Sequence, residues 1–547
     1  MKISSRALAP LSDTVFRRIW SASLLSNLGQ LTLGVAAAWE MTRLTPSPEM
    51  VALVQTSLML PIMLVSVPSG AIADMFDRRK IALAGLGFSA VSAALLAACF
   101  AGGLASPVVL LAFCFCAGAG MALYSPSWQA SIPEQVPPEH LPAAIALGSV
   151  SYNIARSFGP ALGGVAVLAL GATAVFGATA LLYLPLFAAF LFWRRETIPP
   201  RLPPERLDRA IVSGIRYVFY AGTVRTAMLR VLLFGLTSAS LMALTPLVAR
   251  NSLGGDAGTY GLLLGASGVG AVIGAFVLSW VRENIPTDPA LAVATLVLSA
   301  MLLVVAWAGS IWLVAIAMAV SGAATMLSVA TLNVVVQTSV PRWVTARALS
   351  WFSSFLTGGI AFGSWFWGEI AAISGLSNAL SISAGALAAT PLLALISPLR
   401  DSDSPDLSPM EPRPDPNVDL AVTSRSGPIV IEVEYRVERD LARAFYDVML
   451  KVQRLRLRNG AFAWSIARDI GDAELWTERF EFPTWQQYLR HRERFTTADW
   501  DLQLAANGFH KGPPSNVRRR LVRPFGSVRW RAETPVPATD EVGIYNP

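Results

Sequence analysis

Long stretches without charged residues constrain this chain more than any other feature of its sequence. Between Glu49 and Glu134, every Asp, Glu, Lys, Arg and His lies within the segment from Gly70 to Lys80. On either side, about twenty residues pass without a charge, the length a helix needs to cross about 30 Å of hydrocarbon. Of the 547 residues, 54% are hydrophobic and only 14% charged, whereas soluble domains carry about 25% charged residues. The sequence therefore predicts a protein embedded mostly in a membrane.

Similar apolar segments recur along the chain and predict twelve helical spans in two halves. In the first half we expect spans at 19–41, 51–73, 81–102, 107–131, around 148–164, and 173–193. In the second half we expect them at 223–250, 259–281, 289–308, 312–336, 345–373 and 376–396. Lys and Arg gather in alternate loops, and short loops that keep these residues lie on the cytoplasmic side. Both termini are therefore expected in the cytoplasm, and the net charge of +7 reflects topology rather than nucleic-acid binding.

The two halves are predicted to be repeats joined by a basic linker. Val136-Pro137 and Val340-Pro341 each precede an Ala-x-Ala-Leu entry to the next span, as expected of parallel repeats around a central cavity. We expect six-helix bundles at 1–193 and 223–399, with the linker at 194–222. In this linker four apolar residues share one helical face, which predicts an amphipathic helix along the inner membrane surface; they are Leu207, Ile211, Ile215 and Val218.

The charged loop after the second span has a recognisable pattern. Gly70, Asp74, Arg78 and Arg79 match the Gly-x-x-x-Asp-x-x-Gly-Arg-Arg/Lys loop, so the chain resembles the major facilitator superfamily. In that family, the matching Asp and Arg hold the inner ends of the two halves together in the outward-facing state. The sequence departs from the motif on both sides of Phe76, with Met for a basic residue and Asp for Gly. The alternative is that these are ordinary topology charges.

Small residues and a proline mark the fifth span. Gly159, Pro160, Gly163 and Gly164 allow close helix packing and a kink. They resemble the core of the fifth-helix motif of drug and metabolite exporters in the same superfamily, although Ala155 replaces the leading Gly. The resemblance implies export by proton exchange, whereas small-residue packing without a functional role is the alternative.

Five polar residues within or near the spans are candidates for substrate binding or coupling. Arg156 lies roughly midway along its span, where a cation costs about 2.5–3.5 kcal/mol unless it is paired or faces a water-filled cavity. Its partner could be an anionic substrate or an acid such as Glu40 or Glu369, and a purely structural ion pair is the alternative. Asn27 and Gln30 could contact substrate or bond between helices.

Proton coupling requires a titratable group in or near the spans. The three histidines all fall outside the spans, so no membrane histidine can relay protons. We expect Glu369 or Glu40 to be the coupling carboxylate. Interfacial acids that stay ionised are the alternative.

The order of several motifs along the chain makes the resemblance specific to one branch of the superfamily. The chain looks like the enterobactin-exporter-like branch, also called transmembrane secretion effectors, in the segments 38–45, 74–79, 155–164 and 332–364. This resemblance covers nearly the whole chain. It implies a multi-pass protein of the bacterial inner membrane that exports siderophores or other small secondary metabolites, driven by the proton gradient. The expected partners are a small-molecule substrate, protons and the lipid bilayer.

The chain changes character after the last span. Residues 400–428 are rich in Asp, Ser and Pro and predict a linker, 429–525 have a β-α-β-β-α-β pattern typical of a ferredoxin-like domain, and 526–547 form a tail. The domain is similar to small dimeric barrel proteins, some of which are monooxygenases. Trp464, His491 and His510 could suggest catalysis, but no metal-ligand spacing or nucleophile arrangement accompanies them.

We therefore expect no enzyme activity, no cofactor, no metal and no nucleic acid. A regulatory, self-associating or partner-docking role is favoured for the C-terminal domain. The alternative is a membrane-anchored regulatory or enzymatic module for which the membrane part is an importer or a scaffold.

Overall fold

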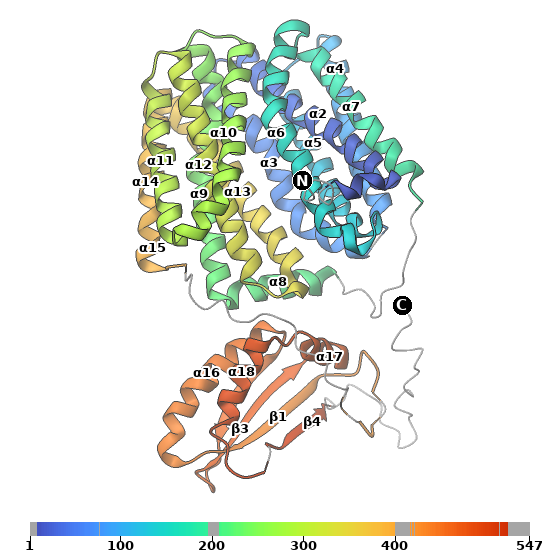
Figure 1. Ribbon diagram of the computed structural model, residues 1–547, viewed down its shortest axis with the longest axis vertical. Helices are drawn as coiled ribbons and strands as arrows, with labels where there is room; N and C mark the ends of the chain where they lie inside the picture. Colours follow the sequence, from blue (N-terminus) through green and yellow to red (C-terminus); the bar gives the residue numbers. More distant parts are fainter. Residues whose placement is uncertain are drawn as a thin grey trace. The chain divides into compact units, whose positions relative to one another are not determined.

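Helices occupy all twelve predicted spans in a computed structural model of the chain. The structure describes residues 8–75, 77–194, 207–399, 416, 418–420, 422–513 and 515–522. Within these ranges, the structure describes only the backbone of residues 69–75, 138, 142, 149, 207–211, 213 and 342. Figure 1 shows long helices followed along the chain by a small sheet with its own helices.

The first half consists of six long helices. They are α2 (Thr14–Leu44), α3 (Pro48–Met75), α4 (Arg78–Ala101), α5 (Pro107–Ser131), α6 (Leu141–Leu170) and α7 (Ala172–Phe192), with short turns η1 (Ala9–Ser12), η2 (Ile132–Glu134) and η3 (Pro138–His140). Local chemistry sets several helix starts. Ser106 caps α5 and precedes a proline in its first turn, and Asp77 accepts a hydrogen bond from the Arg79 backbone at the start of α4, as N-cap side chains do.

The second half repeats this arrangement after the linker helix α8 (Leu207–Tyr220). Its elements are α9 (Gly222–Leu247), the π-turn η4 (Val248–Ser252), α10 (Ala257–Asn284), α11 (Thr287–Trp307), α12 (Ile311–Thr338), α13 (Arg342–Ser374), α14 (Leu376–Ala389), η5 (Thr390–Leu392) and α15 (Leu393–Ile396). Within the described residues, ten helices are long and apolar enough to cross a membrane. The helices α2 and α13 fall outside this set although they have 31 and 33 residues.

One backbone detail shows the repeat directly. Gly171 joins the fifth and sixth helices of the first half with φ 80° and ψ 160°. Gly375 joins the corresponding helices of the second half with φ 88° and ψ 160°. Both joints need glycine because a side chain disfavours positive φ.

The two halves touch along two helix pairs, α6 with α10 and α3 with α13. The Ser157 hydroxyl donates to the Gly268 carbonyl at 3.2 Å, and the Thr56 hydroxyl donates to the Ala361 carbonyl at 2.8 Å. Because consecutive helices reverse direction, the C-terminal part of α6 and the N-terminal part of α3 lie at the same end of the bundle. The stacked rings of Trp39 and Tyr260, 6.3 Å apart, join α2 to α10 at this end as well. We call it the contact end.

Internal contacts divide the chain into two compact units. The helical unit contains the described residues of 1–198, 226–336 and 349–401. The mixed unit contains those of 199–225, 337–348 and 402–547. It therefore combines α8, the joint between α12 and α13, and the C-terminal domain.

Of the four apolar residues predicted to face the membrane from α8, one contradicts the prediction, Ile215 is half-buried, and the side chains of Leu207 and Ile211 lie outside the described residues. Val218, which was expected to face the membrane, is buried at 7% exposure, as is Tyr217 at 1%. The exposed apolar residues are Val212, Phe219 and Tyr220. Helical spacing places Val212 and Phe219 on the opposite face of α8 from Tyr217, whereas Tyr220 lies one turn after Tyr217 at the end of the helix. The reason for the difference is packing inside the mixed unit, which the hydrophobic pattern of a single helix does not contain.

The C-terminal domain has the predicted β-α-β-β-α-β order, with its second helix divided in two. It consists of β1 (Ile429–Arg436), η6 (Arg439–Leu441), α16 (Ala442–Arg458), β2 (Phe462–Arg468), β3 (Leu475–Phe482), α17 (Trp485–Glu493), α18 (Thr497–Asn507) and β4 (Val517–Leu521). The four strands form an antiparallel sheet in the order β2-β3-β1-β4. Figure 1 shows α16 and α18 side by side against this sheet. Alternation along β1 directs Ile431, Val433 and Tyr435 into the core.

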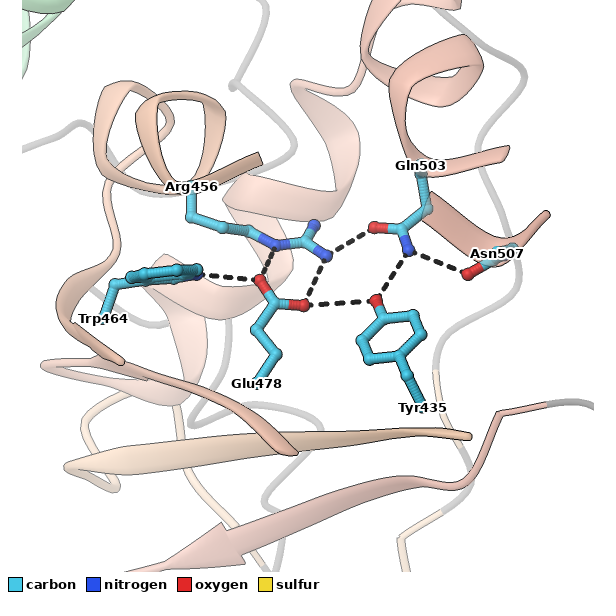
Figure 2. A network of polar contacts seen from close by, with 6 residues as sticks. All are labelled: Tyr435, Arg456, Trp464, Glu478, Gln503 and Asn507. Atoms are coloured by element: carbon cyan, nitrogen blue, oxygen red, sulfur yellow. Dashed lines mark hydrogen bonds and ion pairs between the residues drawn. The ribbon is translucent and has the colours of Figure 1, made fainter. Parts of the chain in front are cut away.

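A buried ion pair lies in the middle of this apolar core. Figure 2 shows Arg456 from α16 donating to both carboxylate oxygens of Glu478 from β3, at 3.0 and 3.3 Å. The Trp464 indole and the Tyr435 hydroxyl also donate to this carboxylate, at 2.9 and 3.3 Å. Gln503 connects Arg456 to Tyr435 and Asn507. Burial by itself would lower the pKa of Arg456, but the Glu478 carboxylate more than offsets this effect and the pKa is raised.

The network predicts a large cost for removing one charge. Glu478 is fully buried, so Glu478→Gln would leave the Arg456 guanidinium without a counter-charge and should destabilise the domain by about 3–5 kcal/mol. Hydrogen exchange in β1 and β3 of the full chain, followed against denaturant, measures this loss. Asp447→Asn is the matched control, because the Arg443–Asp447 pair has side-chain exposures of 87% and 57%, and exposed pairs contribute about 0–1 kcal/mol. Equal losses in the two variants would contradict the prediction.

Candidate functional site

The predicted fifth-span motif packs two faces of α6 against two different helices. A methyl group added at Gly159 would lie 3.0 Å from Leu31 Cβ of α2, and one at Gly163 would lie 3.1 Å from Thr32 Cα. Gly164 instead faces α10, where an added Cβ would lie 2.6 Å from Gly261 Cα. Such close approach requires residues without a side chain. The motif thus brings α6 against both its own half and the other half.

Pro160 lies inside α6 between these glycines without ending the helix. Its carbonyl oxygen would lie 3.1 Å from a Cβ added at Gly261. The proline therefore lies at the contact between the halves, where a helix that lacks one backbone hydrogen bond can bend.

Arg156 precedes this contact directly and lies near the middle of α6. Its own carbonyl oxygen would lie 3.0 Å from a Cβ added at Gly268, so the residue adjoins the interface of the two halves. Its side chain is half-buried. Within the described residues, no hydrogen bond, ion pair or ring contact involves this side chain. The predicted pairing with Glu40 or Glu369 is not formed in this structure.

Asn27 and Gln30 lie on α2, which packs along the α6 segment before and around Arg156. Asn27 is 7% exposed, and its amide lies 3.4 Å from the Ser151 hydroxyl of α6. Because Leu31 lies against Gly159, the intervening Gln30 is level with the α6 segment that contains Arg156. The Gln30 Oε1 atom is buried without a hydrogen-bond partner among the described residues. Asn27 thus serves helix packing, whereas Gln30 retains an unused acceptor.

The two candidate carboxylates differ in their surroundings. Glu40, near the end of α2, accepts from Arg43 at 3.3 Å. Glu369, near the end of α13, is half-buried, and no ion pair or hydrogen bond involves its side chain within the described part of the chain.

The two described arginines of the charged-loop motif bind within the first half. Arg78 donates to the Ala130 carbonyl at the end of α5 and to Glu134 at 3.1 Å. Arg79 donates to the Phe190 carbonyl of α7 at 2.8 Å. These contacts tie the start of α4 to the ends of α5 and α7. The side chains of the other two motif positions, Gly70 and Asp74, lie outside the described residues.

Sequence reasoning missed a second charged cluster, in the other half. Arg230 of α9 donates to the Asp288 carboxylate of α11 and, at 2.7 Å, to the Ser397 carbonyl. Asp288 also accepts from the Leu399 backbone at 2.9 Å. An arginine eight residues after the start of a membrane helix is the signal that could have found it. The cluster fastens the chain after α15 to α9 and α11.

The three residues that suggested catalysis in the C-terminal domain serve its packing. Trp464 belongs to the network around Glu478 (Figure 2). His510 accepts from the Arg436 backbone at 2.8 Å and contacts the Pro513 carbonyl at 2.7 Å. His491 is buried among phenylalanine rings, and burial lowers its pKa to about 3, so its ring is neutral.

Comparison with known proteins identifies the family. Residues 5–525 match the model of the family described as transmembrane secretion effector. The chain is 25% identical over 269 residues to the staphyloferrin A transporter of Staphylococcus aureus, an alignment that covers 49% of this chain and 67% of that protein. It is 26% identical over 239 residues to the uncharacterised MFS-type transporter YfiS of Bacillus subtilis, covering 42% of this chain and 55% of that protein.

Solved structures show the same fold at low sequence identity. A mutant of the nucleoside transporter NupG is 12% identical with a TM-score of 0.58, covering 70% of this chain and all of that one. A bacterial homologue of the human lysosomal transporter Spinster, in an inward-facing and unoccupied conformation, is 15% identical with a TM-score of 0.55, covering 70% of this chain and 94% of that one. The family match to transmembrane secretion effectors agrees with the expectation of a non-enzyme. The chain therefore belongs to the transmembrane secretion effector family of major facilitator transporters.

Proposed function

We propose that this transporter exports a small, anionic secondary metabolite of the siderophore or drug type across the bacterial inner membrane, in exchange for protons. The observation that carries the proposal is Arg156. It is a half-buried cation near mid-membrane, at the interface of the two halves, without a protein partner among the described residues.

An unpaired guanidinium at this depth favours an anionic cargo. A buried charge is stable only when it is paired or hydrated, and no carboxylate among the described residues pairs with Arg156. The planar guanidinium binds carboxylates through two parallel hydrogen bonds. The unused Oε1 acceptor of Gln30, at the same depth, could receive a hydroxyl or amide hydrogen of the same molecule. The related staphyloferrin A transporter is consistent with a siderophore-like cargo.

The packing of the halves supports alternating access. The described contacts between α6 and α10, and between α3 and α13, run from the contact end to mid-depth. If both termini lie in the cytoplasm, as the distribution of Lys and Arg predicts, the contact end is the outer one. The described contacts would then hold the halves together on the outer side of the site around Arg156, and rocking of the halves about this site would expose it to each side in turn.

Export rather than import is supported by two likenesses. The family description refers to secretion, and the α6 motif from Gly159 to Gly164 resembles that of exporters. For coupling, we favour Glu369 over Glu40, because Glu40 is already paired with Arg43.

Arg156→Ala should abolish transport of an anionic cargo, whereas Arg156→Lys should retain part of it because the charge remains. The assay is uptake into inside-out vesicles of a set of iron chelators that carry carboxylates, with neutral catecholate chelators for comparison. Arg250→Ala removes an exposed arginine from the same membrane protein and should leave uptake unchanged. Undiminished carboxylate uptake by folded Arg156→Ala would refute the anion site.

Glu369→Gln should uncouple transport from proton movement, because an amide cannot bind and release a proton in each transport cycle. A pH-sensitive dye in inside-out vesicles should report loss of cargo-induced proton flux, while exchange of labelled for unlabelled cargo continues. Glu283→Gln, at an exposed position, is the control. Normal proton flux in Glu369→Gln would rule out this carboxylate.

Gly164→Ala should force α6 and α10 apart at the contact end, because the new Cβ would lie 2.6 Å from both Gly261 Cα and the Ala257 carbonyl. We expect at least a fivefold loss of transport. Spin labels at Leu104 and Ser310, one in a loop of each half, should report a longer distance. Gly177→Ala is the matched control, since its nearest neighbour would be Ala97 Cβ at 3.9 Å. An unchanged label distance would count against the closed contact end.

A further inference from the structure

The C-terminal domain touches the two joints of the membrane part through a small aromatic cluster. Tyr217 of α8 and Trp343 at the start of α13 pack ring against ring, with centroids 5.7 Å apart at 86°. Tyr217 is 1% exposed. These two rings come from the linker between the halves and from the joint between α12 and α13, and both belong to the mixed unit.

Two arginines of the C-terminal domain cover these rings. The Arg494 guanidinium, directly after α17, lies 4.0 Å from the centre of the Trp343 ring. The Arg458 guanidinium, at the end of α16, lies 5.3 Å from the centre of the Tyr217 ring. Both distances are within the roughly 6 Å at which a cation is attracted to an aromatic face. We call these four residues the latch.

Arg458 is held in place from its own side. It forms an ion pair with Asp499, whose side chain is 4% exposed. Asp499 also accepts from the Asn459 amide at 3.1 Å and completes the capping box at the start of α18. The arginine is therefore preorganised by its domain before it meets Tyr217, so little side-chain entropy is lost on contact.

The latch joins segments that alternating access has to move. The helix α8 is the covalent link between the two halves, and the α12–α13 joint connects two helices of the second half. When the halves rock against each other, a linker that is fastened to one half resists the motion. Each cation–aromatic contact is weak enough to be broken within a transport cycle.

We propose that the C-terminal domain restrains its own transporter: while Arg458 and Arg494 cover Tyr217 and Trp343, α8 and the α12–α13 joint move as one body, and release of the domain speeds transport. The docking part of this inference is independent of the cargo, whereas the restraint rests on the proposed transport function. The test therefore has one readout for each.

The first readout is retention of the domain. A site for a sequence-specific protease is placed between Ser404 and Pro405 of the full chain, in the predicted linker, and membranes are cleaved and washed. The cleaved wild-type domain should stay bound, and the double variant Arg458→Ala/Arg494→Ala should retain it at least tenfold less, equivalent to about 1.4 kcal/mol. Loss of the wild-type domain on washing would overturn the docking.

A matched control separates the latch from general charge. Arg443→Ala/Arg454→Ala removes two exposed arginines from the same domain. It therefore lowers the attraction of the domain to anionic lipid as much as the latch variant does, but its cleaved domain should stay bound like that of wild type. Tyr217→Leu/Trp343→Leu breaks the latch without altering the domain and should release it. Equal retention by latch and control variants would overturn the latch.

The second readout is the initial rate of transport by the uncleaved chain. Both latch variants should transport several-fold faster than wild type and the Arg443→Ala/Arg454→Ala control. Equal or slower transport by variants that have lost retention would overturn the restraint while leaving the docking intact. If no variant and no wild-type protein moves any chelator, the proposed function fails, and the retention result still decides the docking.

Discussion

Backbone-to-backbone contact between the two halves is the constraint on which the membrane part depends. In lipid, apolar side chains gain little by leaving their surroundings, so helices associate through close packing and hydrogen bonds. Gly164 and Gly261 allow α6 and α10 to approach until only hydrogen atoms separate their backbones. The Ser157 hydroxyl can then reach the Gly268 carbonyl of the other half. Such an interface is closely packed but is stabilised only weakly, which suits two halves that separate and re-associate in each transport cycle.

The arginines of the protein illustrate how environment decides the role of one residue type. Arg78 and Arg79 bind helix-end carbonyls and Glu134 within one half, where they fasten neighbouring helices. Arg230 does the same in the other half with Asp288 and Ser397. Arg456 is buried with Glu478 and fixes the core of the C-terminal domain. Among these arginines, Arg156 lies at the interface of the halves and has no partner in the part of the chain that the structure describes; this is why we propose that it binds the cargo.

The C-terminal domain combines a rigid interior with an adaptable surface. Its central ion pair is bonded by Trp464, Tyr435 and Gln503, so the core has one arrangement in which every charge is satisfied. Its contacts with α8 and the α12–α13 joint include two arginines over aromatic rings. A domain that keeps its shape while its contacts are exchanged is suited to regulation.

The sequence by itself determined the elements and their order. Uncharged stretches of about twenty residues specify membrane helices because the bilayer requires internally bonded backbone, and alternation in β1 specifies a half-buried strand. The motif glycines of α6 and the mid-span position of Arg156 were also readable, because both are local properties of one helix. Partners were not. That Gly159 and Gly163 meet α2 while Gly164 meets α10, that Arg156 pairs with neither Glu40 nor Glu369, and that Tyr217 and Val218 are buried in α8 were decided only by tertiary structure, because each depends on which surfaces distant segments bring to the same place.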